Sequence, residues 1–122
     1  MSNFKVKGGR EDISLIGKNV IVTNHFANRW NERVLNGEAD EEDALADVEK
    51  KLAYATYLKK LTGDYYILFN YLIIADENEG KVHLITVLGE INRCERLISY
   101  LIENGPDKLG HEIKKYGKLP LI

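Results

Sequence analysis

Two apolar runs separated by a short polar loop constrain the fold of this chain most. Residues 64–75 and 81–88 are rich in Ile, Leu, Val and Tyr, and the loop 76–80 between them reads Asp-Glu-Asn-Glu-Gly. Such runs predict a β-hairpin. Because both are apolar at consecutive positions, we expect the sheet to be covered on both faces. With the turn centred on Asn78, Asn70 would lie opposite Thr86 as a polar pair in need of partners.

The clearest helical pattern follows Asp40. Four acidic residues come first, where carboxylates favour the positive end of a helix dipole. An apolar stripe then recurs at helical spacing from Leu45 to Leu61, and Gly63 provides a stop. The pattern predicts one long helix of about 35 Å. A helix of that length would extend beyond a small globule, so we expect a partner subunit to cover its far end.

The remaining elements flank these two. Residues 19–23 are β-branched and predict a strand, followed by a helix that Thr23 or Asn24 caps and Asn36-Gly37 ends. A last helix is expected over 90–104, with Cys94 on its inward face. The order predicts an α+β fold, a small antiparallel sheet with a β-hairpin packed against three helices, one of them long.

Length and composition place the chain among ordinary globular proteins. Its 122 residues suit a single domain over 1–122, with an N-terminal arm over 1–18 and a C-terminal tail over 106–122. The longest apolar stretch, 65–75, is too short to cross a membrane as a helix, and a single cysteine excludes an internal disulfide. We therefore expect a cytoplasmic protein that does not engage membranes. The net charge of −2 is unlike that of a dedicated duplex-binding protein.

The first helix carries the best candidate site. His25, Arg29 and Arg33 recur every four residues and so share one ridge beside the stripe that holds Phe26 and Trp30. Two guanidiniums near a helix N-terminus suit a phosphate or diphosphate, and the two aromatic rings could stack on a base or ribose. The alternative is that both arginines pair with Glu32 or with carboxylates of the next helix.

Further polar residues could complete such a site. They are Asn70 and Thr86 on the hairpin, and Asn92 and Arg93 where the last strand gives way to a helix, a geometry that suits anions. His83, in the middle of a strand, is either a packed core residue or a ligand contact. The pattern of His and Cys predicts no metal site, and no glycine-rich phosphate loop or cofactor motif is present.

The helix of residues 24–33 carries a first resemblance. Its His-x3-Arg-x2-Glu-Arg motif (His25, Arg29, Glu32, Arg33), after a strand and before a helix and a hairpin with Thr86, resembles the ribonuclease-toxin-like domains of the RelE superfamily. The resemblance implies RNA cleavage, with His25 as general acid or base and Arg29 and Arg33 on the phosphate. Those toxins are strongly basic, and this chain is not.

Size, composition and the same helix are also similar to small phage anti-defence proteins of the anti-Thoeris type. That resemblance implies sequestration of a cyclic ADP-ribose signal in the host cytoplasm, without catalysis or cofactor. The ridge would hold the phosphates, Phe26, Trp30 or a tyrosine would stack on adenine, and the remaining polar residues would contact the riboses or diphosphate.

We expect the chain to bind a small nucleotide-like anion without cleaving it, as a homo-oligomer formed through the long helix and a tyrosine cluster (Tyr54, Tyr57, Tyr65, Tyr66, Tyr71). RNA is a partner only under the alternative of a RelE-like ribonuclease. A third reading is an oligomeric protein–protein adaptor with no ligand.

Overall fold

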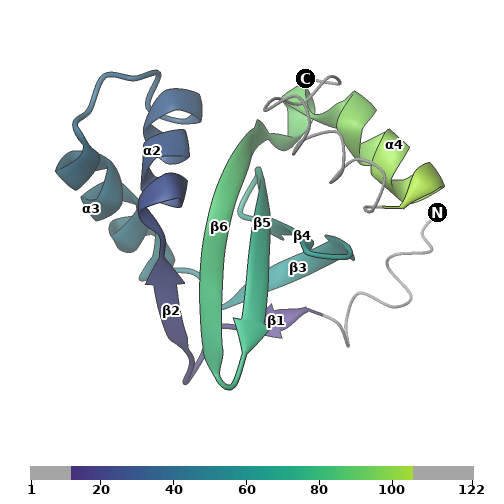
Figure 1. Ribbon diagram of the computed structural model, residues 1–122, viewed down its shortest axis with the longest axis horizontal. Helices are drawn as coiled ribbons and strands as arrows, with labels where there is room; N and C mark the ends of the chain where they lie inside the picture. The colour runs from purple at the N-terminus through teal and green to yellow at the C-terminus, as the bar shows by residue number, and fades with distance from the viewer. Residues whose placement is uncertain (1–11, 106–122) are drawn as a thin grey trace.

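The computed structural model describes residues 12–105, so the predicted tail and most of the predicted arm lie outside the described range. Within it the fold is α+β, as expected, and a curled sheet packs against three helices (Figure 1). In chain order the elements are β1 (Ile13–Ser14), β2 (Asn19–Val22), α2 (Asn24–Arg33), α3 (Glu41–Leu52), β3 (Tyr57–Thr62), β4 (Tyr65–Leu68), β5 (Tyr71–Asn78), β6 (Lys81–Glu90), the 3₁₀ turn η1 (Ile91–Arg93) and α4 (Glu95–Asn104).

The sheet is larger than predicted and is not purely antiparallel. Its six strands run in the order β1-β3-β4-β5-β6-β2, and β2 lies parallel to β6 at one edge. β6 is the longest strand and carries two register shifts against β5, which leave Ile85 and Leu88 without a partner across the ladder. Bulges of this kind bend a strand and increase its twist, which accounts for the curvature of β6 in Figure 1.

Both faces of the sheet are covered, as its apolar strands predict. Residues of α2 and α3, including Phe26 and Val48, pack with one set of strand side chains, such as Ile73 and Leu84. On the other face, Leu97 and Leu101 of α4 pack against a second set (Leu61, Tyr65, Leu72, Leu88). Alternate residues of β5 and β6 therefore belong to separate cores, so consecutive positions in these strands are apolar.

The predicted long helix is wrong in its second half. α3 ends at Leu52, where the Ala53 amide still bonds to Glu49, and the chain enters β3 at Tyr57. Leu58 then lies in the α2–α3 core and Leu61 in the α4 core, two places that a single helical stripe could not reach. In a strand, residues three apart point to opposite faces, so the spacing of these two leucines also fits β3. With 12 residues, α3 is too short to extend beyond the globule, so its length does not call for a partner subunit.

The hairpin also differs from the prediction. Its first run is two strands, β4 and β5, joined at Phe69–Asn70, and its loop is only Glu79–Gly80, because residues 76–78 belong to β5. Positive φ at both positions, 52° at Glu79 and 78° at Gly80, makes the shorter turn possible. The shorter turn and the bulge at Ile85 both change the register, so Thr86 lies opposite Ile74 rather than Asn70.

The first and last helices agree better with expectation. Thr23 caps α2 by accepting a hydrogen bond from the Phe26 amide at 3.0 Å, as predicted. α4 begins at Glu95 rather than Glu90, because β6 and η1 continue to Arg93, and it ends before Gly105, which has a φ of 82°. Within residues 12–105, no helix combines the length and the apolar character that crossing a membrane requires.

Candidate functional site

Helix α2 occupies the edge of β6 where β2 stops. The last residue of β6 that pairs with β2 is Leu84. Beyond it, the Thr23 hydroxyl lies 3.0 Å from the Leu84 carbonyl oxygen and 3.2 Å from that of Ile85, and Arg33 Nη1 donates to the Val87 carbonyl at 2.8 Å. Side chains at both ends of α2 thus donate hydrogen bonds to carbonyl oxygens at the edge of β6, where the amides of a further strand would otherwise donate. These bonds fix how α2 lies along β6.

His25, Arg29 and Arg33, which we call the α2 ridge, are close enough to affect one another. His25 is exposed, while Arg29 and Arg33 are partly buried. Burial lowers the pKa of His25 from its usual value, the positive charges of Arg29 and Arg33 lower it further, and Glu32 opposes them. His25 is therefore mainly neutral at pH 7, beside two permanent positive charges.

The two arginines of the α2 ridge are held differently. Arg29 Nη1 pairs with Glu32 one turn along the helix at 2.5 Å, which is the pairing proposed as the alternative to a ligand. Arg33 instead bonds to a backbone carbonyl, and burial lowers its pKa, with Arg29 adding to the effect. Burial also raises the pKa of the Cys94 thiol, which Arg33 counteracts. Arg33 therefore lies near the start of α4 as well as on β6.

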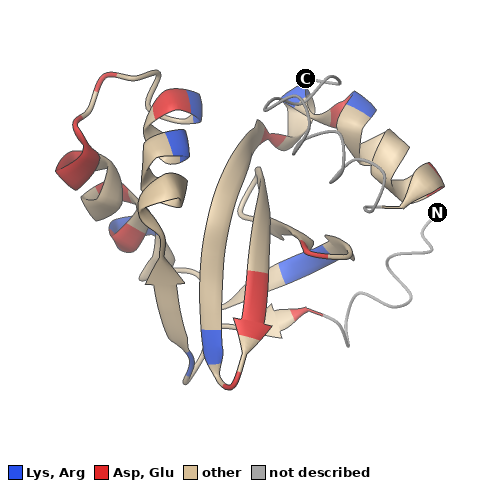
Figure 2. Ribbon diagram, in the orientation of Figure 1, with Lys and Arg blue, Asp and Glu red and all other residues tan. Residues whose placement is uncertain are grey.

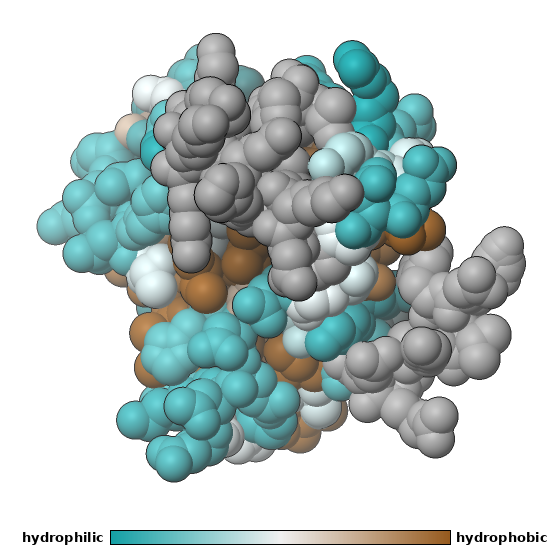
Figure 3. All heavy atoms as spheres, turned by 45° about the vertical axis from the view of Figure 1, so that its right-hand side comes forward, coloured by the Kyte–Doolittle hydropathy of each residue, from teal (hydrophilic) through white to brown (hydrophobic). Residues whose placement is uncertain are grey.

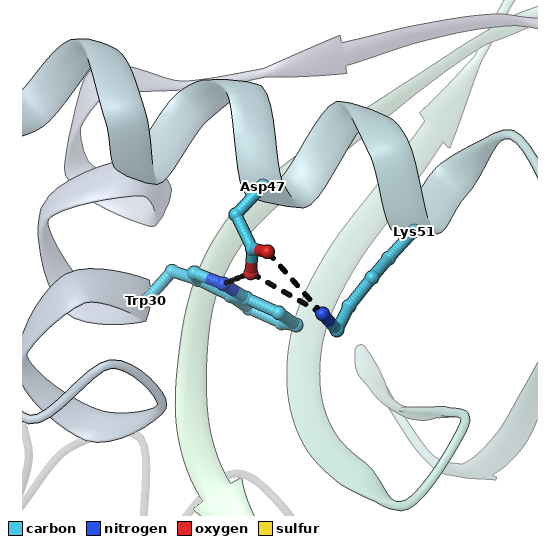
Figure 4. Close-up of polar contacts among 3 residues, drawn as sticks. All are labelled: Trp30, Asp47 and Lys51. Carbon is cyan, nitrogen blue, oxygen red and sulfur yellow. Dashed lines mark hydrogen bonds and ion pairs between the residues drawn. The ribbon is translucent and has the colours of Figure 1, made fainter. Parts of the chain in front are cut away.

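The predicted stacking role of Phe26 and Trp30 is corrected by the structure. Both rings are fully buried and pack on each other at 6.0 Å, and Trp30 also meets Tyr71 edge-on at 5.0 Å. The Trp30 indole N–H donates to Asp47 at 2.8 Å, and Lys51 completes the contact from the next turn of α3 (Figure 4). A satisfied indole in the core joins α2 to α3 and offers no face to a ligand.

Asn70 and Thr86 are not close together, contrary to the expected pairing. Asn70 is exposed in the β4–β5 turn, and its carbonyl accepts a hydrogen bond from Ile91 at 2.8 Å. Thr86 is 9% exposed and lies opposite Ile74, which packs with the α4 core, so it points away from the face that α2 covers. His83 is half-buried opposite Asp76, at the other end of β6 from Val87.

Asn92 and Arg93 are exposed in η1, before α4 rather than in its first turn. A three-residue turn does not supply the helix dipole that the sequence reading gave them. The bond from Ile91 to the Asn70 carbonyl brings Asn70 to this same end of the sheet. The predicted residues thus fall into three places: the α2 ridge, the end of β6 around η1, and the core. Within residues 12–105, no group of three or more His, Cys, Asp and Glu side chains is arranged to hold a metal ion.

Charges of both signs are distributed over the molecule. Figure 2 shows red and blue together on α2 and at the start of α4, red at the start of α3 and the end of β5, and blue on β3 and at the start of β6. The acidic end of β5 includes Asp76 and Glu77, and Glu77 pairs with Lys18. On α2, Arg29 and Arg33 stand against one carboxylate, Glu32, so this helix has a local excess of one positive charge in a chain of net charge −2.

Sequence reasoning missed a pocket of about 220 Å³ at the far end of α3. Figure 3 shows hydrophobic residues reaching the surface among hydrophilic ones on one face of the molecule. Polar and apolar residues together line the pocket. Tyr54 and Tyr57 belong to the tyrosine cluster predicted from the sequence. Phe69 was not expected beside them, because the sequence analysis did not predict the turn between β4 and β5 that brings it there. The pocket is lined by Tyr54, Ala55, Thr56, Tyr57, Lys59, Ile67, Leu68 and Phe69.

Comparison with protein-family models, with curated proteins and with solved structures finds no match for this chain. The geometry of the molecule is therefore the basis for any functional conclusion.

Proposed function

We propose that this chain binds a small nucleotide-like phosphate ligand on the α2 ridge and holds it without breaking a bond. The observation that carries the proposal is the anchoring of Arg33 on the Val87 carbonyl, with Arg29 and His25 following on the same side of α2. One carbonyl fixes the position of a guanidinium but uses only one of its five N–H donors. The other donors suit phosphate oxygens.

The ion pair between Arg29 and Glu32 is compatible with this role. Both side chains are substantially exposed, at 33% and 55%. Exposed pairs contribute little to stability, typically 0–1 kcal/mol, so a phosphate could replace Glu32 as the partner of Arg29 at low cost. In the absence of ligand, Glu32 holds the guanidinium in place and limits the entropy lost on binding.

The biological setting proposed with this function is the one that the anti-Thoeris resemblance implies, a phage or mobile-element protein that sequesters a signalling nucleotide in the host cytoplasm. Asn92 and Arg93, exposed near the end of β6, are proposed as further ligand contacts, whereas Phe26 and Trp30 are no longer part of the site. A homo-oligomer is proposed as well, now without the support of a long helix.

A second candidate is RNA cleavage of the RelE-like kind, and one observation favours it. The lowered pKa leaves His25 neutral near pH 7, the state in which an imidazole accepts a proton from a ribose hydroxyl. Arg29 and Arg33 would then stabilise the charge that develops on the phosphate. The acidic balance of the chain argues against tight binding of a long RNA.

Native mass spectrometry separates the two candidates. The protein is measured alone and after incubation with cyclic nucleotides, linear nucleotides and a short RNA. An adduct of nucleotide mass, released unchanged on denaturation, supports sequestration, and the spectrum also counts the subunits. Shortened RNA without a stable adduct would contradict sequestration and make His25 catalytic.

Substitutions in the α2 ridge show whether this ridge binds the nucleotide. Arg29→Ala and Arg33→Lys should reduce the adduct. Lys81→Ala is the control matched to Arg29→Ala, because it removes one positive charge too but lies at the opposite end of β6 from Val87. An adduct that persists in both ridge variants would overturn the proposed site.

A further inference from the structure

The face of the sheet that α4 covers is left open at one end. Leu58 of β3 and Leu68 of β4 belong to the α2–α3 core. Their neighbours Tyr57 and Ile67 therefore point to the other face, because successive side chains of a strand alternate. On that face α4 packs over a separate core (Leu61, Tyr65, Leu72, Leu88) but leaves Tyr57 51% exposed. The pocket of about 220 Å³ lies at this open end.

Large hydrophobic side chains gather around this pocket without being buried. Tyr54 is 81% exposed and Phe69 49%, and both line the pocket with Tyr57. Ile16, which is 75% exposed, adjoins them, because the amide of the residue before it donates to the Thr56 carbonyl of the pocket wall at 2.9 Å. We call Ile16, Tyr54, Tyr57 and Phe69 the open patch. Single exposed hydrophobic residues are normal, whereas a group of them in one place marks a binding surface.

Phe69 adds an independent observation. It has a φ of 57°, in the left-handed region that a bulky side chain rarely adopts. Glycine or asparagine would suit this turn position better, so the phenylalanine costs stability where it stands, and half of it remains exposed. Backbone strain of this kind is found mainly at functional sites. Its position is therefore better explained by a contact that a single copy of the chain does not make.

From this arrangement we infer that the open patch is the interface between two copies of the chain related by a two-fold axis, with Tyr54 of each copy in the pocket of the other. In such a dimer the same surface serves both partners and must be complementary to itself. The open patch meets this condition, because it holds both a projecting ring, Tyr54, and a hollow. Tyrosine is also among the residues that contribute most to binding at the centre of an interface.

The size of the open patch suits a dimer. At about 150–250 Å² for a whole aromatic side chain, the exposed parts of the three rings amount to roughly 300–450 Å², and Ile16 adds to this area. A standard interface buries about 800 Å² on each partner, and a little more than half of that area is non-polar. The open patch therefore supplies most of the non-polar share that a stable dimer needs.

The charge around the pocket is also compatible with a second copy. Among the described residues that line it, Lys59 is the one charged side chain, and it already has an interaction partner in the chain. A nucleic acid or another polyanion would require several available cations at this surface. The lining instead presents mainly rings and uncharged groups, which two copies can bring together.

The inference rests on the homo-oligomer included in the proposed function, and it names the surface that forms it. It also changes the predicted tyrosine cluster. Tyr65 and Tyr66 are buried in the two cores and cannot contact a partner, whereas Tyr54 and Tyr57 remain and Phe69 joins them.

Sedimentation velocity of the full chain, from low to high protein concentration, tests the inference. Tyr54→Glu is the first variant, because a residue so exposed tolerates substitution and the carboxylate would enter the partner's pocket. Phe69→Gly is the second, since it removes a ring and relieves the backbone conformation, so it should fold at least as stably as wild type. The matched control is Ile102→Glu, which adds the same charge at a residue of α4 that is 51% exposed and outside the open patch.

We expect the wild-type protein to be a dimer that dissociates on dilution, and each of the two variants to weaken dimerisation by about 30-fold or more, the usual effect of losing a central interface residue. Ile102→Glu and Arg29→Ala should dimerise like wild type. In NMR spectra of the wild-type protein, the amides of residues 54–57 and 67–69 should shift as the protein concentration rises.

Two outcomes would overturn the inference. A wild-type protein that stays monomeric at every concentration would remove the homo-oligomer as well, whichever other segment or protein then proves to cover the open patch. A dimer that persists in both variants would remove the inference alone, because the copies would then meet elsewhere. Nucleotide binding is read separately, from the adduct in native mass spectrometry. If patch variants dissociate the dimer and wild type forms no adduct, the interface stands and the proposed ligand is wrong.

Discussion

Arg33 donates from Nη1 to the carbonyl oxygen of Val87 at 2.8 Å and so joins the end of α2 to β6 beyond the reach of β2. The bond gives one residue two roles. It supplies an edge carbonyl of the sheet with a donor, and it holds a positive charge at a fixed point of the α2 ridge. Structure and proposed function therefore depend on the same guanidinium.

The two arginines should differ in their effect on stability. Arg33→Ala is expected to lower the free energy of unfolding by about 1–2 kcal/mol, because it removes a charge-assisted hydrogen bond. Arg29→Ala should stay within about 1 kcal/mol of wild type, since it breaks only an exposed pair with Glu32. Urea unfolding of both variants measures the difference. A larger loss for Arg29 would make it a structural residue and remove it from the candidate site.

The Thr23 hydroxyl should stabilise the fold through both of its hydrogen bonds. Thr23→Ala removes the cap on the Phe26 amide and the bond to the Leu84 carbonyl, so we expect a loss of about 1–2 kcal/mol. Thr23→Ser keeps the hydroxyl and should recover most of that loss. Thermal and urea denaturation of the two variants provide the comparison. Equal losses would show that the methyl group, and not the hydroxyl, stabilises this junction.

Trp30 should act through the core alone. Trp30→Ala is expected to destabilise the fold by about 3–5 kcal/mol because a fully buried indole is lost. Trp30→Phe keeps much of the packing and removes the bond to Asp47, so its loss should be smaller and should be partly shared with Asp47→Asn. Chemical denaturation gives these values, and nucleotide binding is measured on the folded Trp30→Phe protein. A large drop in its affinity would return Trp30 to the ligand site.

His25 should titrate below its usual pKa of about 6.5. Arg29→Ala should raise that pKa by removing a positive charge, and a bound phosphate should raise it by adding a negative one. Phosphate itself also gains a proton between pH 7 and pH 5, so the shift in the pKa of His25, rather than the affinity, reports the contact. NMR titration of the His25 ring, with and without inorganic phosphate, measures each shift. A pKa that phosphate leaves unchanged would place the anion elsewhere.

The lowered pKa of His25 also makes the free energy of unfolding depend on pH. Because the pKa of His25 is lower in the folded state than in the unfolded state, the unfolded chain binds more protons as the pH drops through 6.5. His25 therefore reduces stability on the acid side of that value and has no effect well above it. His25→Gln should remove this part of the pH dependence in urea unfolding experiments.

Local patterns determined much of this fold from sequence. The cap at Thr23, the first turn of α3 and the inward residues of α4 follow from short-range chemistry, namely hydroxyl-to-amide bonds, carboxylates at a helix dipole and apolar spacing. The α2 ridge is likewise a matter of spacing within one helix. Such features depend on neighbours a few residues away, which the sequence alone displays.

Tertiary structure decided the rest. Leu58 and Leu61 also fit a helical stripe, and only the two separate cores place them on opposite faces of a strand. The two-residue turn at Glu79–Gly80 and the bulge at Ile85 together decide that Ile74 lies opposite Thr86. The pocket at Phe69 arises only when the segment after α3 meets the β4–β5 turn. Each of these outcomes depends on contacts between distant segments, where burial and strand register outweigh local preference.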